Sequence, residues 1–378
     1  MPAPSGLSLE RARDELEWEY LRFQLRRRLQ NAPPPTEPPA PTELHLELTH
    51  RCNLKCVMCE HWRLEHSDPR SVGREMSFED IREAVEGSAL LRGIGQIVVT
   101  GGEPWLRHDI VGILAFLGAR FPEASIIVLT NFWNTGHLRL KLSELRGRGL
   151  KALRLGSSLD GIETTHDEVR GQRGAFAGLI STVKALRGEF PDIPFGFTFT
   201  ITPRNAREVF RAYRFVEEEL GCSLGAQWVI ERDGAEPVRW DDGSRAAAMA
   251  GIAEVLRHLC RKHEALRRWR SPERERWGWL WSELLYWDYL SQYGAQPERF
   301  SFFRRCGAGR RHVMLDPEGE LFFCPVNRDM SAGNVRNQPL DAVWSSDKAR
   351  AVREFVDSGR CHCWLRCMAT PVLDQLIA

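Results

Sequence analysis

Three cysteines lie close together near the start of the chain, in the stretch THRCNLKCVMCEHW at residues 49–62. Cys52, Cys56 and Cys59 are separated by three residues and then by two. A closed zinc or iron–sulfur site needs four protein ligands, so three thiolates leave one metal position open for another molecule. The spacing therefore predicts a metal centre with an exchangeable position. A partial zinc site and three unrelated thiols are the alternatives.

A second group of cysteines lies near the end of the chain. It comprises Cys306, Cys324, Cys361, Cys363 and Cys367. The N-terminal residues MPAPSGLSLE lack the basic start and apolar core of a signal peptide, and no run approaches the roughly 20 apolar residues of a membrane span. We therefore expect a cytoplasmic protein, whose thiols serve metal binding or catalysis and not disulfides. The isolated Cys222 and Cys260 are expected to be buried packing residues.

The overall charge excludes some classes of partner. The chain has 52 basic and 51 acidic residues and a net charge of +1, so it has no global field that would attract nucleic acid or anionic lipid. Hydrophobic residues make up 43% and charged residues 27%, which are ordinary globular values. The overall charge therefore does not indicate a binding partner, and only individual sites can do so.

Strand and helix patterns alternate from residue 42 onward. Strands are predicted at residues 43–49, 96–102, 125–131, 152–161, 195–202 and 226–232. Helices are predicted near 77–91, 108–120, 138–149, 174–189 and 204–219. Repeated β-then-α units favour a parallel sheet with right-handed crossovers. The predicted fold class is α/β, a partial (β/α)6 TIM-like barrel that is open on one side.

The loops after these strands hold the polar, glycine-rich and cysteine-bearing segments, where barrel enzymes carry their chemistry. In the first strand Leu44 and Leu46 share one face, and His45 and Glu47 share the other. If the apolar faces pack on helices, the interior of the barrel is polar. A polar interior suits a ligand cavity better than a filled core.

The cysteine loop, together with the GGEPW that ends the next predicted strand, resembles the radical S-adenosylmethionine (radical SAM) enzymes. Their signature is Cys-x3-Cys-x2-Cys after strand one, and Cys52, Cys56 and Cys59 match it without a gap. The resemblance implies a [4Fe–4S] cluster on these cysteines, with S-adenosylmethionine (SAM) bound at the fourth iron. It also implies an electron donor such as flavodoxin or ferredoxin.

The resemblance extends to residues that would bind SAM. Glu103 would hold the SAM amine, beside Gly101, Gly102 and Pro104, and Met58 would lie near the adenine. The stretch SSLDGIETTHDEVRG (157–171) resembles a run found in radical SAM proteins with a C-terminal extension. It implies that Ser158 and Asp160 lie near the SAM ribose and that Arg170 could pair with a carboxylate. The alternative is that these residues have a structural role, as a helix cap and a surface ion pair. Thr130 and Asn131 are weaker candidates.

The C-terminal cysteines resemble those of the SPASM/twitch auxiliary-cluster domain. The run Cys-x12-Gly-x4-Cys from Cys306 to Cys324 carries the likeness, and HVMLDPEGELFFC within it predicts a β-hairpin. A full SPASM domain would hold two further clusters on seven cysteines, so five thiols imply one auxiliary [4Fe–4S] cluster on four of them. The closing run departs from the usual Cys-x2-Cys, which leaves open whether Cys361 or Cys363 is a ligand. A structural zinc site is the alternative.

Four segments are expected along the chain. They are an N-terminal helix with a proline-rich linker (1–41), the radical SAM barrel (42–235), a helical tryptophan-rich connector (236–300) and the auxiliary-cluster domain (301–378). Residues 268–294 carry five of the 13 tryptophans. They are interpreted as a helix that joins the two domains, or as an aromatic wall over the open side of the barrel.

The resemblance implies a radical SAM enzyme of the oxidoreductase or transferase type. It would cleave SAM reductively to a 5′-deoxyadenosyl radical and abstract hydrogen from an unactivated carbon, leading to dehydrogenation, epimerisation or C–C bond formation. Only about 40 residues precede the barrel, too few for a leader-binding winged helix, so a small or lipid-like metabolite is the expected substrate. A SPASM-type maturase acting on a peptide is the alternative, and a non-catalytic iron–sulfur scaffold is more remote.

Overall fold

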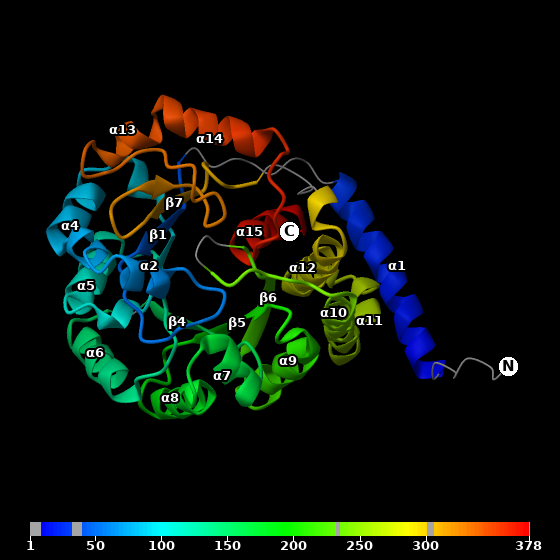
Figure 1. The fold of residues 1–378 in the computed structure, drawn as a ribbon. Helices are drawn as coiled ribbons and strands as arrows, with labels where there is room; N and C mark the ends of the chain where they lie inside the picture. Colours follow the sequence, from blue (N-terminus) through cyan, green and yellow to red (C-terminus); the bar gives the residue numbers. More distant parts are fainter. Residues whose placement is uncertain (1–8, 32–39, 151, 232–234, 301–305, 378) are drawn as a thin grey trace.

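The computed structural model of the chain describes residues 9–31, 40–150, 152–231, 235–300 and 306–377. Within these residues, eight strands form one sheet in the order β6-β5-β4-β3-β2-β1-β7-β8. The strands are β1 (Glu43–Glu47), β2 (Gln96–Thr100), β3 (Ser125–Leu129), β4 (Leu153–Ser158), β5 (Phe195–Ile201), β6 (Ser223–Trp228), β7 (His312–Leu315) and β8 (Leu321–Phe322). Strands β1 to β6 are parallel neighbours, which confirms the predicted α/β fold with a partial barrel (Figure 1).

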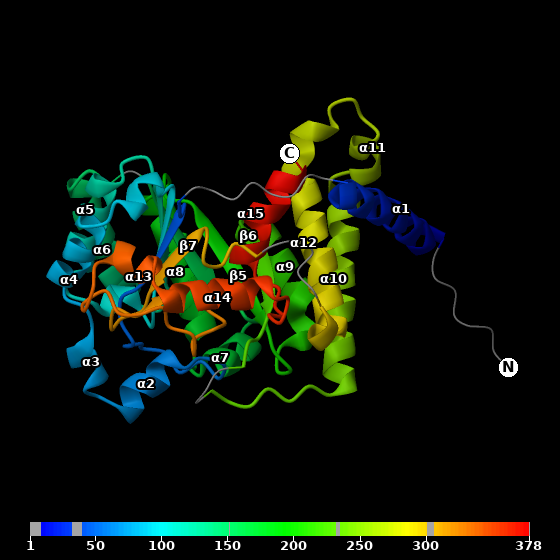
Figure 2. The same ribbon diagram turned by 90° about the horizontal axis from the view of Figure 1, so that it is seen from above.

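Helices surround this sheet on its outer side (Figure 1). The α-helices are α1 (Leu9–Asn31), α2 (His61–Ser67), α3 (Ser71–Arg74), α4 (Phe78–Glu86), α5 (Ile110–Arg120), α6 (Thr135–Gly147), α7 (Thr164–Arg170), α8 (Ala175–Glu189), α9 (Val209–Glu218), α10 (Asp242–Lys262), α11 (Ala265–Trp269), α12 (Gly278–Ala295), α13 (Leu340–Trp344), α14 (Asp347–Asp357) and α15 (Arg366–Ile377). Figure 2 shows α2, α3 and α7 on one side of the barrel and α11 on the opposite side.

Local sequence explains where several helices begin. Ser77 precedes α4 and Asp241 precedes α10, and each forms a capping box with the residue three positions later. Val209, Ala212, Tyr213 and Val216 recur at helical spacing in α9 and are buried. These apolar stripes hold the helices against the sheet.

Most predicted strands extend further at their C-terminal ends than the observed ones. The first strand was predicted to residue 49 and β1 ends at Glu47, and the fourth was predicted to 161 whereas β4 ends at Ser158. The sixth was predicted at 226–232; β6 starts earlier, at Ser223, and residue 232 lies outside the described residues. The residues after β1 and β4 leave the sheet and form the loops that carry the candidate site.

The predicted C-terminal hairpin is confirmed, and it extends the barrel sheet. Strand β7 pairs antiparallel with β8 and parallel with β1, where Glu43 is opposite His312. The pairing with β1 joins two segments that the sequence treats as separate domains. The sheet is therefore continuous from β6 to β8.

The tryptophan-rich segment packs on β6, at the edge of the sheet opposite β8. The indole of Trp228 in β6 donates to the carbonyl of Leu290 in α12 at 2.9 Å, and the hydroxyl of Tyr286 donates to the carbonyl of Ala226. The indole of Trp364 donates to the carbonyl of Tyr286 at 3.0 Å. Helix α12 therefore contacts both the last barrel strand and the C-terminal segment.

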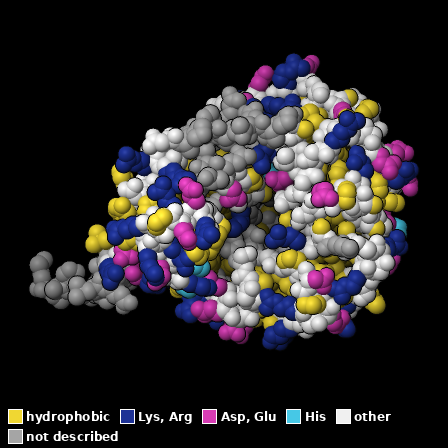
Figure 3. All heavy atoms as spheres, turned by 180° about the vertical axis from the view of Figure 1, so that it is seen from behind, with side chains coloured by type: hydrophobic (Ala, Val, Ile, Leu, Met, Phe, Trp, Pro, Cys, Tyr) yellow, Lys and Arg dark blue, Asp and Glu magenta, His cyan; other side chains and the backbone are white. Residues whose placement is uncertain are grey.

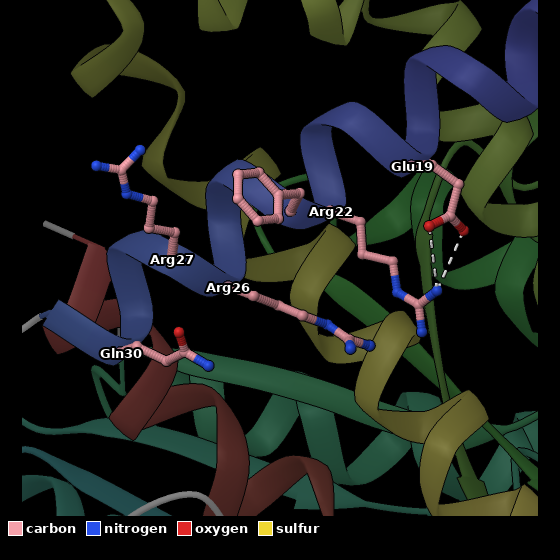
Figure 4. Close-up of a pocket in the computed structure, with 6 residues that line it drawn as sticks. Glu19, Arg22, Arg26, Arg27 and Gln30 are labelled. Carbon is pink, nitrogen blue, oxygen red and sulfur yellow. Dashed lines mark hydrogen bonds and ion pairs between the residues drawn. The ribbon is translucent and has the colours of Figure 1, made fainter.

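The N-terminal helix α1 packs on α10, α11, α12 and α15. Arg22 and Arg26 both form ion pairs with the buried Asp288 of α12, at 2.9 and 2.6 Å. In Figure 4 these two arginines extend from α1 in one direction and Arg27 extends in the other, around a surface groove of about 380 Å³. The predicted helix is confirmed, whereas the predicted proline-rich linker lies, at residues 32–39, outside the described residues.

Acidic and basic side chains are interspersed over the face drawn in Figure 3, which is hollowed near its centre. This mixture agrees with the net charge of +1. Within the described residues, no helix combines the length and the apolar character needed to cross a bilayer.

Candidate active site

The three-cysteine loop follows β1 and is held by the backbone of its neighbours. The amides of Gly102 and Glu103 donate to the carbonyls of Thr49 and Arg51, each at 2.7 Å. The amide of Val57 donates to the carbonyl of Val169, at the end of α7, at 3.0 Å. The loop is thus fixed on both sides before any metal binds.

The two glycines at the end of β2 explain this close approach. A Cβ on Gly102 would lie 2.2 Å from the carbonyl oxygen of Arg51, and one on Gly101 would lie 2.5 Å from that of Thr49. Gly101 also has a φ of +125°, which other residues rarely adopt. In the structure these two glycines admit the backbone of the cysteine loop.

The three thiols of the cysteine loop lie close enough together for the charge of Cys56 to act on both Cys52 and Cys59. Three thiolates would hold three irons of a [4Fe–4S] cluster and leave the fourth iron open. Burial raises the pKa of the Cys52 and Cys59 thiols to about 12, so their thiolates require a nearby positive charge. The donor set therefore fits an iron–sulfur cluster.

One such charge comes from Arg170, at the end of α7. Its guanidinium lies 3.4 Å from the sulfur of Cys56 and forms an ion pair with Asp160 at 2.9 Å. Asp160 is fully buried and also accepts from the amide of Thr200 in β5 at 2.6 Å. The pairing expected for Arg170 is present, and it joins the Ser-Leu-Asp-Gly and His-Asp-x-x-Arg-Gly segments to the cysteine loop.

Gly171 is the tightest point of this contact, and a substitution there gives a sharp test. Its φ is +62°, and a Cβ would lie 2.0 Å from the carbonyl oxygen of Lys55. Gly171→Ala should lower the free energy of unfolding by about 2–4 kcal/mol and reduce iron at the first cysteine group. Denaturant titration and iron analysis would measure both.

Gly188→Ala is the matched control, because a Cβ on Gly188 in α8 meets nothing within 4 Å. That variant should be neutral or stabilised by up to about 1 kcal/mol. Equal stability of the two variants would contradict the steric argument.

Glu103 presents a buried carboxylate beside the cysteine loop. It accepts from the amides of Asn131 at 2.8 Å and Trp105 at 3.3 Å and from the hydroxyl of Thr130 at 3.1 Å. No cationic side chain pairs with it among the described residues, and burial raises its pKa to about 7. A fixed anion without a cation partner suits a cationic ligand such as an ammonium group.

Of the remaining candidates, Pro104 and Asn131 adjoin this carboxylate, whereas Ser158 belongs to β4. Pro104 is buried and starts the short 3-10 helix Pro104–Leu106. The amide side chain of Asn131 donates to Asn53 in the cysteine loop at 2.6 Å. Ser158 lies at the end of β4, opposite Thr198 in β5.

An open cavity of about 190 Å³ adjoins the cysteine loop inside the barrel. Its lining includes Met58 and Cys59 from the loop, Glu47 from β1, Thr200 from β5 and Gln227 from β6. These polar strand residues confirm the polar interior expected from the alternation in the strands. Apolar Leu44 and Leu46 lie in the core on the other face of β1.

Arg328 closes this cavity from the C-terminal domain and was not identified from the sequence. Its guanidinium pairs with the carboxylate of Glu47, which is only 4% exposed. Burial alone would raise the pKa of Glu47, but the charges of Arg328 and His61 lower it below its usual value. The pair places one positive and one negative group beside Cys59.

The second cysteine group also comes together. Cys324 follows β8, Cys306 precedes β7, and Cys367 lies in the first turn of α15. Burial, together with nearby thiols of the same group and, for Cys367, the carboxylate of Glu43, raises the pKa of Cys306 and Cys367 to about 12. Cys361 and Cys363 hydrogen-bond to each other, and Cys363 is also close enough to Cys306 and Cys324 for their charges to act on it.

Comparison with known protein families agrees with this geometry. Residues 46–216 match the model of the radical SAM superfamily, and residues 306–368 match SPASM, an iron–sulfur cluster-binding domain. Residues 46–216 therefore form a radical SAM domain, and residues 306–368 form a SPASM domain. Its cofactors are accordingly SAM and a [4Fe–4S] cluster, with an auxiliary cluster in the SPASM domain.

Two curated relatives of this chain differ in the chemistry that their names describe. Fe-coproporphyrin III synthase of Methanosarcina barkeri (strain Fusaro / DSM 804) is 32% identical over 46% of this chain and 40% of its own length. The antilisterial bacteriocin subtilosin biosynthesis protein AlbA of Bacillus subtilis (strain 168) is 27% identical over 82% of this chain. The chain spans 60% of AlbA's length.

The fold also matches a solved structure. Streptococcus suis SuiB superposes with a TM-score of 0.56 at 14% identity, over 94% of this chain and 75% of that one. At this identity the likeness shows the fold alone.

Proposed function

We propose that this protein is a radical SAM enzyme whose SAM cluster is held by Cys52, Cys56 and Cys59. The observation that carries the proposal is the buried Glu103, which faces the three-thiol loop without a cationic partner among the described residues. A scaffold that only carries clusters would have no use for such a carboxylate. When bound and reduced, the cluster and SAM supply a 5′-deoxyadenosyl radical that removes hydrogen from an unactivated carbon.

Different residues of this chain would contact different parts of SAM and of the cluster. Glu103 would bind the SAM ammonium, and Met58, which lines the cavity, would contact the adenine. Arg170 would offset the negative charge of the thiolates through its contact with Cys56. Asp160 is fully buried, so we infer that it acts by positioning Arg170 and not by touching SAM. An electron donor such as flavodoxin or ferredoxin would supply the reducing electron.

In the second group, Cys306, Cys324 and Cys367 with one of Cys361 and Cys363 would hold the auxiliary cluster. Cys363 is the better candidate of the two, because the charges of Cys306 and Cys324 both act on its thiol. Four protein ligands would leave no position for SAM, so this cluster would serve electron transfer or substrate contact.

For the substrate, we infer a peptide whose reacting residue enters the cavity. AlbA, a bacteriocin biosynthesis protein, matches 82% of this chain, and the matched part includes residues on both sides of the connector. The cavity beside the cysteine loop is open, so a segment of a longer molecule can reach the SAM site from outside. A small metabolite remains the second candidate, because the relative that matches 46% of this chain is named Fe-coproporphyrin III synthase.

The two substrate classes can be separated by one experiment. Anaerobically reconstituted enzyme would be mixed with SAM, reductant and fractions of an extract from the producing cells, divided at about 1 kDa. A larger fraction should raise 5′-deoxyadenosine above the substrate-free rate and lose this effect after protease digestion. Stimulation by the smaller fraction alone, resistant to protease, would favour the metabolite.

SAM affinity should depend on pH through Glu103. Burial raises the pKa of this carboxyl to about 7, so below pH 7 a growing fraction is neutral and does not attract an ammonium. Affinity should therefore fall up to about tenfold for each unit below pH 7. Glu103→Gln should weaken binding by about 1.5–3 kcal/mol and remove this dependence. Anaerobic titration with SAM would measure both.

Glu144→Gln on the surface of α6 is the control and should keep the wild-type profile. A Glu103→Gln variant that binds SAM with unchanged affinity and unchanged pH dependence would remove Glu103 from the site.

A further inference from the structure

Glu43, His45 and His312 form a compact cluster on the inner face of the sheet. Glu43 and His312 are direct partners across β1 and β7, and His45 lies two residues along β1 on the same face. Glu43 and His312 are 7% and 2% exposed, and His45 is half-buried. Within the described residues, this is the only set of three or more His, Cys, Asp or Glu ligand atoms that lie within 4.8 Å of one another.

The three ligand atoms form an equilateral triangle. The distance is 3.4 Å from Glu43 Oε2 to His45 Nε2, 3.4 Å from Glu43 Oε2 to His312 Nδ1, and 3.4 Å from His45 Nε2 to His312 Nδ1. A tetrahedral zinc ion with bonds of about 2.0–2.1 Å has its ligand atoms about 3.3–3.4 Å apart. The triangle therefore has the size of one face of such a site.

Hydrogen bonding alone explains this arrangement poorly. Contacts of 3.4 Å are longer than the usual 2.7–3.2 Å of an N–H···O bond. Glu43 Oε2 already accepts from the amide of Gln96 at 3.0 Å, so two imidazoles would be second and third donors to one oxygen. The other ring nitrogen of His312, Nε2, is buried and has no partner among the described residues. A buried imidazole whose only contacts are long, and are made by one of its two nitrogens, gains little to offset its burial.

The surroundings of the cluster are compatible with a cation. Burial lowers the pKa of His312 to about 4, so its ring is neutral at pH 7, which is the form that binds metals. The two imidazole rings meet edge to face, at 72°, so their nitrogens can point at a common centre. Two charged or titratable neighbours face Glu43. The guanidinium of Arg311 is a positive charge that acts on this carboxylate, and the carboxylate in turn acts on the thiol of Cys367.

We propose that Glu43, His45 and His312 bind one divalent cation of the zinc class, at a site separate from both cysteine groups. The donor set is two imidazoles and one carboxylate, which zinc accepts with a fourth position left for water. Two ligands come from the first strand of the barrel and one from the C-terminal hairpin. The ion would tie the radical SAM barrel to the SPASM domain across the β1–β7 pairing.

The experiment uses holoenzyme whose cysteines are already occupied by iron. Reconstituted protein would be incubated with Zn²⁺, desalted and analysed for zinc and iron. The wild type should retain about one zinc per chain beyond its iron, and His45→Ala and Glu43→Gln should lose it with iron unchanged. His258→Ala is the matched control, because His258 pairs with Glu217 at 2.7 Å without a third ligand; this variant should keep the zinc.

X-ray absorption at the zinc edge tests the site in the wild type, without any variant. Nitrogen and oxygen neighbours at about 2.0–2.1 Å are expected, with no sulfur neighbour at about 2.3 Å. Zinc retention that is the same in wild type and His45→Ala would overturn the proposal. A sulfur shell would do so too, because it would place the zinc on cysteines.

Discussion

Cys56→Ala should abolish formation of 5′-deoxyadenosine and remove about four of the roughly eight irons expected from two [4Fe–4S] clusters. Cys56 is buried in the loop after β1, and its sulfur receives the guanidinium of Arg170. Two remaining thiols cannot hold three corners of a cube, so the site for SAM cleavage would be lost. Iron analysis and chromatography of the reaction products would measure both effects, and Cys52→Ala and Cys59→Ala should behave alike.

Two further variants show whether this loss belongs to the first cluster. Cys324→Ala should also lose about four irons but should retain slow, substrate-independent SAM cleavage while product formation ceases. Cys260→Ala, in the buried face of α10, should keep all of its iron and activity. Because a lost cluster can unfold the domain around it, circular dichroism must show that each variant is folded. A folded Cys56→Ala enzyme that still forms 5′-deoxyadenosine would contradict the assignment.

Arg328→Met should destabilise the protein by about 3–5 kcal/mol, because it leaves the buried carboxylate of Glu47 without its cation. The side chain of Glu47 is 6% exposed and that of Arg328 is 21% exposed, so water screens the pair only weakly. The double variant Glu47→Gln with Arg328→Met should recover most of the loss, since no charge remains buried. Denaturant titrations of the four proteins form a double-mutant cycle.

The loss in Arg328→Met should depend on pH. In the wild type the pKa of Glu47 is lowered, so the stability it contributes is present above its unfolded pKa near 4.5 and disappears as pH falls through the folded value. Without Arg328, burial would raise this pKa, and protonation at lower pH would relieve the destabilisation. The difference in the free energy of unfolding between the wild type and Arg328→Met should therefore become smaller toward acid pH. Arg74→Met, which breaks exposed ion pairs with Glu318 and Asp68, should lower the stability far less than Arg328→Met does.

Much of the barrel and of the first cysteine site could be predicted because the signals are local. The spacing of Cys52, Cys56 and Cys59, the glycines before Glu103 and the alternation in β1 all lie within short stretches. Side-chain period and turn chemistry act over a few residues, so a single sequence reveals them. Strand ends were less exact, because the last residues of a predicted strand can equally form the loop that carries the site.

Features that depend on distant pairing were missed. Nothing near His312 indicates that β7 pairs with β1, since His45 and His312 are 267 residues apart in the chain. Similar separations conceal the cluster of Glu43 with the two histidines and the ion pair of Arg328 with Glu47, which are 281 residues apart. The only sequence signal was the row of polar residues on one face of the first strand, which indicated a polar interior but not its partners.

The position of β1 between β2 and β7 has a consequence for synthesis of the chain. Strand β1 is made early, but the strand that covers its second edge leaves the ribosome 267 residues later. At roughly 5–20 residues per second, that edge stays open for about 13–53 s. Open strand edges invite pairing with other chains, and charged side chains discourage it. Glu43, His45 and Glu47 occupy alternate positions of β1, so the residues that later line the barrel interior can also protect the nascent strand from aggregation.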